Sequence, residues 1–134
     1  MIDVEIGQIM TETVVTVTES QSLADAGAVM TDADIKSVIV SDAAERPIGI
    51  LTSTDFVELA ADDESPAQSS VGTYMTDDIV TATPDTPVRE AANLMVEHNI
   101  SHLPVVQDDG RLTGIVTTTD VAAYVSGLND LLPE

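Results

Sequence analysis

The sequence of this chain repeats itself after 65 residues, and the two copies align without a gap. Sixteen residues between positions 7 and 55 are identical to the residue 65 positions further on. The agreement is strongest where Gly49-Ile50-Leu51-Thr52-Ser53-Thr54-Asp55 is matched by Gly114-Ile115-Val116-Thr117-Thr118-Thr119-Asp120. Because both copies carry the same pattern, we expect two similar modules. We predict repeat 1 at residues 1–62, a linker at 63–70 and repeat 2 at 71–134.

Each copy predicts the same series of elements. A β-branched run predicts a short strand at 13–17, and again at 78–82. A helix follows, beginning at Ser20 or Ser22 in repeat 1, and in repeat 2 at Thr86 with Pro87 in the first turn. Two strands joined by a polar turn come next, at 37–41 and 48–52, and at 102–106 and 112–117. A last helix is expected after Asp55, over 56–60, and after Asp120, over 121–128. The fold class is therefore α/β (α+β), with tandem β-α-β-β-α units.

One face of each predicted sheet is left uncovered by the helices of its own unit. Ile39, Leu51 and Val116 are assigned to this face and would be exposed to water if a unit stood alone. Two copies can bury these faces by packing sheet to sheet with pseudo-two-fold symmetry, which predicts a pair of related clefts. Matched methionines are interpreted as core residues: Met10, Met30, Met75 and Met95.

The charge composition excludes several classes of function. Four Lys and Arg stand against 24 Asp and Glu, and the formal net charge is −20. With so few cations, neither nucleic acid nor an anionic membrane is an expected partner. No apolar run is long enough to span a bilayer, and without Cys there is no disulfide framework, so we expect a cytoplasmic protein. The dispersed acids favour adaptation to concentrated salt, where charges are strongly screened; an acidic surface that meets a basic partner is the alternative.

The repeated threonines and aspartate have two interpretations. At a strand-to-helix junction, a threonine can cap the helix and the aspartate can favour its positive end. The same groups can instead bind a ligand, with the carboxylate accepting hydrogen bonds from a ribose diol while hydroxyls and helix N–H groups hold phosphate. Their recurrence in both copies, after a glycine that allows close backbone approach, favours the binding interpretation.

These residues resemble those of a known family. The two Gly-x-x-Thr-x-Thr-Asp segments, together with Ile9-Met10-Thr11, Tyr74-Met75-Thr76 and Ile100-Ser101-His102-Leu103-Pro104-Val105-Val106, resemble the CBS domain. Over about residues 5–128 the chain resembles a stand-alone CBS pair, or Bateman module. The resemblance implies a non-catalytic regulatory sensor that binds AMP, ADP, ATP or S-adenosylmethionine between the repeats and modulates a partner enzyme or transporter. It also implies a homodimer, with no cofactor required beyond the regulatory ligand.

By this resemblance, each ligand site is built across the repeats. Ligand site 1 comprises Thr52, Thr54 and Asp55 with Val80, Thr81, Ser101 and His102. Ligand site 2 comprises Thr117, Thr119 and Asp120 with Val15, Thr16, Lys36 and Ser37. Adenine is expected between aliphatic side chains: Ile35, Val38, Ile100 and Leu103. Because Lys36 is the one lysine of the chain, site 2 is expected to bind phosphate better.

Other chemistry is not favoured by the sequence. His98 and His102 are the only histidines and fall on different predicted elements, so no zinc site is expected. No Ser/His/Asp or Cys/His arrangement can be assembled, and we expect neither a catalytic nor a metal-binding residue. A metal-dependent hydrolase that uses the acidic residues would have to turn over ATP with Mg²⁺. A scaffold that dimerises or docks on a partner without any ligand is the main alternative.

Overall fold

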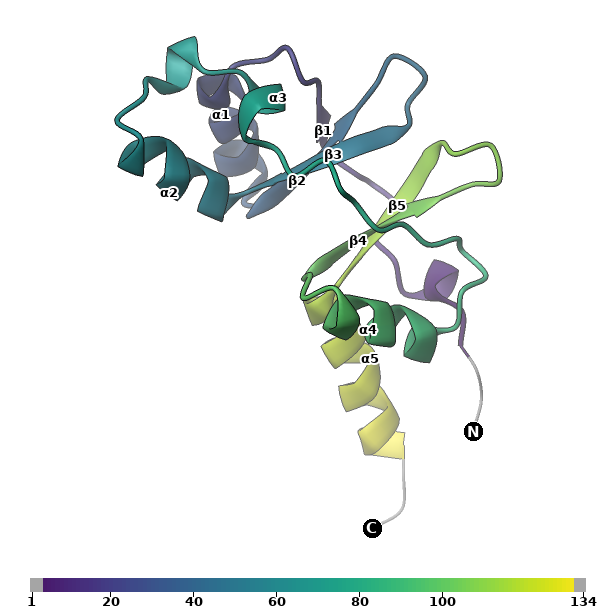
Figure 1. The fold of residues 1–134 in the computed structure, drawn as a ribbon. Coiled ribbons are helices and arrows are strands. Elements are labelled where there is room, and N and C mark those ends of the chain that lie inside the picture. Colours follow the sequence, from purple (N-terminus) through teal and green to yellow (C-terminus); the bar gives the residue numbers. More distant parts are fainter. Residues whose placement is uncertain (1–3, 132–134) are drawn as a thin grey trace. The chain divides into compact units, whose positions relative to one another are not determined.

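The computed structural model describes residues 4–131, which form two compact units (Figure 1). The repeat-1 unit consists of residues 14–79, and the repeat-2 unit combines residues 4–13 with residues 80–131. Each unit contains a small sheet with helices, so the predicted α/β class is confirmed. The outer ends of the predicted repeats, residues 1–3 and 132–134, lie outside the described residues.

The repeat-1 unit is built around a three-stranded sheet. Its elements are β1 (Thr16–Val17), α1 (Leu23–Ala33), β2 (Ser37–Ser41), β3 (Pro47–Thr52), α2 (Ser53–Ala61), η2 (Pro66–Gln68) and α3 (Val71–Tyr74). The strand order is β1-β2-β3, with β1 parallel to β2 and β2 antiparallel to β3. The predicted strands and helices of repeat 1 are confirmed, although β1 is shorter than the predicted strand at 13–17.

The repeat-2 unit has the same plan with a smaller sheet. Its elements are η1 (Ile6–Gln8), α4 (Val88–Glu97), β4 (His102–Val106), β5 (Leu112–Thr117) and α5 (Thr118–Leu131). β4 and β5 pair antiparallel. The predicted strand at 78–82 is wrong: in this stretch only Ala82 forms an isolated parallel bridge, to Val105.

The first helix of each repeat begins according to local capping chemistry, which confirms one predicted start and corrects the other. α1 begins as expected after Ser22, whose hydroxyl accepts the N–H of Asp25 at 3.0 Å. In repeat 2, Pro87 and not Thr86 is the N-cap, because Pro87 keeps an extended ψ of 144° and the helix begins at Val88.

The second helix of each repeat begins earlier than predicted. α2 begins at Ser53 and α5 at Thr118, so each helix includes the aspartate that was predicted to precede it. In repeat 1 the reason is that Thr52 is extended and caps the helix, which places Asp55 at the third helical position.

Each unit has its own cluster of buried apolar residues. The repeat-1 core joins α1 to the sheet and contains Leu23, Ala26, Met30, Val38, Val40 and Leu51. The repeat-2 core contains Ala91, Met95, Leu103, Val105 and Val116. Met10 and Met75 pack against these cores, so the interpretation of the four methionines as core residues is confirmed.

The assignment of the uncovered sheet face is partly wrong. Leu51 and Val116 point into the cores of their own units. In the antiparallel register Leu51 lies opposite Val38, whereas Ile39 lies opposite Ile50. Paired residues share a face, so Ile39 and Ile50 are the ones that face away from the core. Ile39 is fully buried and is not a member of the core cluster.

The first segment of each repeat packs in the unit that contains the remainder of the other repeat. Ile6, from repeat 1, is fully buried in the repeat-2 core, and its N–H donates to the Thr86 carbonyl at 2.8 Å. Val71, from repeat 2, is fully buried in the repeat-1 core, and its N–H donates to the Gln21 carbonyl at 2.8 Å. The compact units and the predicted repeats are therefore divided at different residues.

Two glycines make this exchange of segments possible. Thr11 and Ile115 exchange two backbone hydrogen bonds, and Met10 then lies directly over Gly114. A Cβ on Gly114 would lie 2.5 Å from the Met10 sulfur, so any larger residue here would force this methionine to move. Gly49 lies in the same way under Met75, where a Cβ would come within 2.6 Å of the sulfur.

Candidate functional site

In the repeat-2 unit, the threonine–aspartate motif forms a compact corner between β5 and α5. The Thr117 N–H donates to Oδ2 of Asp120 at 2.9 Å, and the Asp120 N–H donates to the Thr117 hydroxyl at 3.1 Å. This reciprocal pair is a capping box, in which each side chain satisfies the other residue's backbone N–H. We call Thr117, Thr119 and Asp120 the repeat-2 corner.

The corresponding corner of repeat 1 has the same geometry. The Thr52 N–H donates to Oδ2 of Asp55 at 2.7 Å, and the Thr52 side chain completes the capping box. Asp55 is only 8% exposed, and burial raises the pKa of its carboxyl above the ordinary value of 3.8. The hydrogen bond from the Thr52 backbone opposes this shift, and the charge of Glu58 adds to it. We call Thr52, Thr54 and Asp55 the repeat-1 corner.

Each corner has a neighbouring strand in its own unit. In repeat 2, His102 lies opposite Thr117 in the register, and the Thr118 N–H donates to the Ser101 carbonyl at 3.1 Å. Burial lowers the pKa of His102 below its ordinary value of 6.5, so its neutral imidazole is favoured.

In repeat 1, Ser37 and Lys36 take the corresponding places. Ser37 lies opposite Thr52, and both the N–H and the hydroxyl of Ser53 donate to the Lys36 carbonyl, at 3.1 and 3.2 Å. The two corners thus differ in their neighbours, with a lysine and a serine in one unit and a serine and a histidine in the other.

Within each unit, the corner lies together with the four residues that were predicted to complete the other ligand site. The repeat-1 unit holds Val15, Thr16, Lys36 and Ser37 with the corner of Asp55, although these four were assigned to the site of Asp120. The repeat-2 unit holds Val80, Thr81, Ser101 and His102 with the corner of Asp120, although they were assigned to the site of Asp55. The grouping of residues across the repeats stays a prediction.

Two of the residues expected to contact adenine are excluded by burial. Val38 is 1% exposed and Leu103 is 0% exposed, and both lie inside the cores, so this expectation is wrong. Thr52 and Thr117 instead share a sheet face with Ile50 and Ile115, which are partly exposed. These isoleucines are part of the repeated Gly-Ile motif, but only the strand register shows that they point away from the cores.

The corners have capacity for further hydrogen bonds. The capping box engages Oδ2 of each aspartate, and a carboxylate has a second oxygen that can accept donors such as a diol. The hydroxyls of Thr54 and Thr119 are on exposed residues in the first turn of each helix, where backbone N–H groups give a positive potential. In the part of the chain that the structure describes, no three His, Cys, Asp or Glu residues are grouped to hold a metal ion.

The CBS domain model of known protein families matches residues 6–62 and 71–127 of this sequence. The chain therefore belongs to the CBS domain family and carries two tandem copies of the domain. Among residues 4–131, none of the helices combines the length and the apolar character needed to cross a bilayer.

Solved structures of CBS domain pairs have the same fold. The CBS domain pair of protein MJ0100, in complex with 5′-methylthioadenosine and S-adenosyl-L-methionine, is 28% identical, with a TM-score of 0.86. The match covers 94% of this chain and 98% of that one. CBSX2 in complex with AMP is 26% identical, with a TM-score of 0.83, over 94% of this chain and 98% of that one.

The matching relatives differ greatly in length. A 17.7 kDa protein from Acidianus ambivalens is 34% identical over 120 residues, which is 88% of this chain and 71% of the relative. The match spans 62% of a Methanopyrus kandleri protein and 23% of an inosine-5′-monophosphate dehydrogenase from Nitrosopumilus maritimus. The enzyme of this comparison is thus much longer than the CBS pair that it contains.

Proposed function

We propose that this chain is a non-catalytic regulatory module that binds an adenosine-type ligand at its threonine–aspartate corners and thereby modulates a partner protein. The observation that carries the proposal is that the same contact recurs in the two units: the Thr52 N–H donates to Oδ2 of Asp55 at 2.7 Å, and the Thr117 N–H donates to Oδ2 of Asp120 at 2.9 Å. Similar CBS pairs were solved with AMP, or with S-adenosyl-L-methionine and 5′-methylthioadenosine, which supports the adenosine class. A homodimer of this chain is part of the same proposal.

In this proposal each part of the corner has one role. The aspartate accepts hydrogen bonds from both ribose hydroxyls, because its charged oxygens are strong acceptors next to a helix N-terminus. The hydroxyls of Thr54 and Thr119 contact the group attached to the ribose 5′ position. Ile50 and Ile115 offer an aliphatic surface to adenine, which replaces the two buried residues first expected there.

Lys36 distinguishes two ways of completing the sites. Its backbone carbonyl accepts hydrogen bonds from Ser53, next to the corner of Asp55, whereas the sequence resemblance assigns it to the site of Asp120. If Lys36 contacts a phosphate beside Asp55, K36A weakens ATP binding in the D120N background and has no effect in D55N. The opposite pattern supports the predicted grouping across the repeats.

The proposal is tested by titrating the purified chain with AMP, ATP and S-adenosylmethionine in concentrated KCl. Replacing Asp55 or Asp120 with Asn keeps an oxygen for the capping hydrogen bond but exchanges a charged acceptor for a donor. Each replacement should weaken binding at its corner by about 10- to 100-fold, the loss expected for a hydrogen bond to a charged group. D108N, which removes one charge from an exposed turn, is the matched control and should leave affinity unchanged.

A scaffold that binds no ligand is the second candidate, and one observation favours it. Both aspartates are already engaged as helix caps, so the corners are stable without any ligand. A real ligand adds RT ln(1 + [L]/Kd) to the free energy of unfolding and so raises the melting temperature, whereas a scaffold responds to none of the three compounds. Unchanged melting temperatures with all three would therefore support the scaffold and contradict the proposed binding.

A further inference from the structure

The helices that follow the two corners carry the same threonine and aspartate in their first turn but differ one turn further on. Glu58 in α2 corresponds to Ala123 in α5. Each residue of an α-helix lies about 100° around the axis from the residue before it, so Glu58 lies between Thr54 and Asp55 and one turn beyond them. A ligand that Thr54 and Asp55 hold therefore meets Glu58 on the same side of α2.

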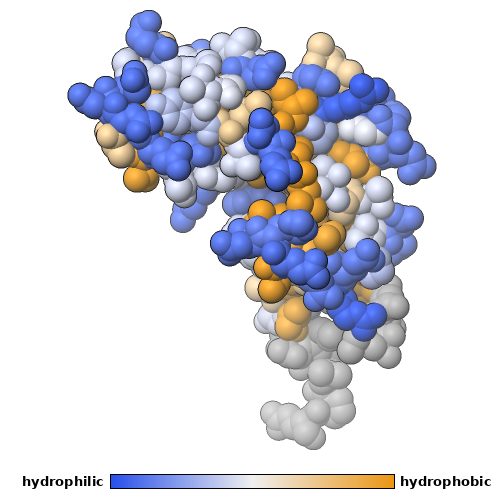
Figure 2. Space-filling model, viewed as in Figure 1, coloured by the Kyte–Doolittle hydropathy of each residue, from blue (hydrophilic) through white to orange (hydrophobic). Residues whose placement is uncertain are grey.

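Glu58 is close enough to Asp55 for the two charges to interact. Burial is the main reason that the pKa of the Asp55 carboxyl is raised, and the negative charge of Glu58 adds to this shift. Glu58 itself is exposed, on a unit where hydrophilic side chains are seen at the surface in Figure 2. The repeat-1 corner thus presents two negative charges, of which only that of Asp55 belongs to the repeated motif.

Asp55 keeps one oxygen for a ligand although the residue is only 8% exposed. Its Oδ2 accepts the Thr52 N–H at 2.7 Å, whereas no donor among the described residues reaches its Oδ1. In the described part of the chain, no buried polar side-chain atom lacks a partner, so this Oδ1 is open to solvent. A carboxylate with one free oxygen in an otherwise buried residue can accept a donor from a ligand.

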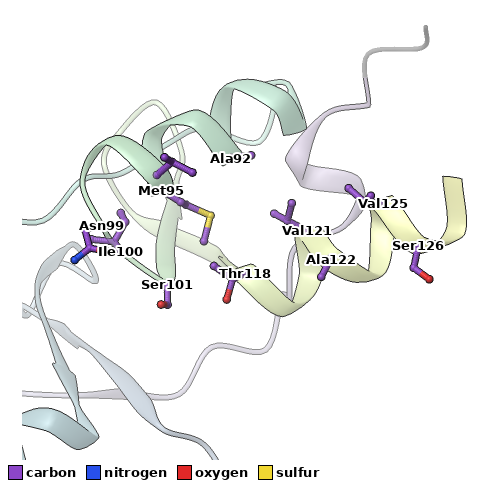
Figure 3. Close-up of a pocket in the computed structure, with 11 residues that line it drawn as sticks. Ala92, Met95, Asn99, Ile100, Ser101, Thr118, Val121, Ala122, Val125 and Ser126 are labelled. Carbon is purple, nitrogen blue, oxygen red and sulfur yellow. The ribbon is translucent and has the colours of Figure 1, made fainter. Parts of the chain in front are cut away.

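The repeat-2 corner lacks the second charge, because Ala123 stands at the matched position. Beside this corner, Ser101 and Thr118 line an open hollow of about 740 Å³ between α4 and α5 (Figure 3). The described residues that line the hollow are all uncharged. Among the residues of this corner and this lining, Asp120 is thus the only charged one.

We infer that Glu58 makes the repeat-1 corner selective for an adenosine-type ligand with a cationic 5′ group, such as S-adenosylmethionine, over phosphorylated nucleotides, and that the repeat-2 corner lacks this selection. The 5′ group of S-adenosylmethionine has a positive sulfonium and a positive ammonium, whereas that of AMP or ATP is a negative phosphate. Glu58 attracts the first kind of group and repels the second. This inference deepens the proposed function and rests on it for binding at the corners.

The same ligand also suits the one lysine of this unit. The Lys36 carbonyl accepts the N–H of Ser53 at 3.1 Å, at the start of α2. The amino-acid part of S-adenosylmethionine carries a carboxylate in addition to its ammonium, so it has a charge opposite to Lys36 as well as to Glu58. Every protein in the test below keeps Lys36, so that only the charge at position 58 or 123 changes.

The test measures the Kd of S-adenosylmethionine and of AMP by isothermal titration calorimetry in about 0.15 M KCl. The D120N background weakens the repeat-2 corner, so that binding reports on the repeat-1 corner. In this background E58Q removes the charge and keeps the size of the side chain, and E90Q makes the same exchange at an exposed residue of the other unit. In the D55N background, A123E adds the charge to the repeat-2 corner, and A123Q adds a similar size without charge.

We expect E58Q to weaken the binding of S-adenosylmethionine about 3-fold and to strengthen that of AMP about 3-fold, the size expected for one exposed charge. The ratio of the two Kd values then changes about 10-fold. A123E should change this ratio by about as much in the opposite direction, while E90Q and A123Q leave it unchanged. At about 1 M KCl the effect of E58Q should shrink, because exposed charges are screened.

The possible failures are distinguishable. If both ligands bind and E58Q leaves the ratio of their Kd values unchanged, the inference is overturned and the proposed function is not. A change in the same direction for both ligands would mean that Glu58 supports the structure of α2, which overturns the inference too. If neither ligand binds to the unaltered chain, the proposed function fails and the inference fails with it.

Discussion

Replacing Gly114 with alanine tests whether the first segment of repeat 1 is an integral part of the repeat-2 unit. The added Cβ would lie 2.5 Å from the sulfur and 3.0 Å from Cγ of Met10, and 3.1 Å from the carbonyl oxygen of Thr11. Favourable contacts between heavy atoms lie near 3.5–4.0 Å, so all three are too close. The methionine side chain can move aside, but the Thr11 carbonyl is held by its hydrogen bond from Ile115 at 3.0 Å.

The expected cost follows from these distances. Adding a carbon atom to a well-packed contact typically lowers the free energy of unfolding by about 1–3 kcal/mol. For a chain of this size, this corresponds to a drop in melting temperature of roughly 4–12 °C. Truncating Met10 to alanine removes the two closest contacts, so G114A should cost about 1 kcal/mol or less in the M10A background.

The assay is urea denaturation of the four proteins in this double-mutant cycle, followed by circular dichroism. Gly127 provides a control of opposite sign, because a Cβ there meets nothing within 4 Å. Since it lies in α5, G127A should stabilise the chain, by up to about 1 kcal/mol. If G114A costs as much with Met10 truncated as with Met10 present, the methionine does not lie over this glycine and the reasoning fails.

Three further predictions follow from the described contacts. Because burial favours neutral His102, its contribution to the free energy of unfolding is complete above about pH 6.5 and is lost as the pH falls toward its lowered pKa. Urea titrations near pH 5 and pH 8 should therefore show a smaller loss of stability at pH 5 for H102Q than for the unaltered chain. S22A should lower the free energy of unfolding by about 1 kcal/mol, because the N–H of Asp25 loses its cap, and S20A is the control that should change little. A fragment of residues 14–79 should show cooperative thermal unfolding while a fragment of residues 1–62 does not, since only the first contains Val71; equal behaviour of the two would contradict the unit boundaries.

The sequence predicted the repeated elements well because the apolar pattern of each copy matches its own helices and hairpin. The sequence did not predict which face of the sheet each apolar strand residue occupies. Ile39 and Leu51 are both apolar strand residues, and only the register, with Ile39 opposite Ile50, shows that they point in opposite directions. It also placed the start of the last helices too late, since the aspartates join the first turn through the capping box.

The candidate corners were recognisable from the sequence because threonine and aspartate three positions apart satisfy a capping geometry at a strand-to-helix junction. The residues that lie next to the corners could not be identified in the same way. Placing His102 beside Thr117 requires the pairing of β4 with β5, which depends on the irregular register between Val105 and Val106. Resemblance alone assigned His102 to the other corner.

The exchange of first segments has a consequence for the order in which the chain can fold as it leaves the ribosome. Residues 14–79 are contiguous, so one unit can close as soon as Ile79 is free. The stretch that contains Ile6 is made before these residues, yet its place in a core does not exist until α5 has been synthesised. The segment around Ile6 is thus translated before the repeat-1 unit but buried after it.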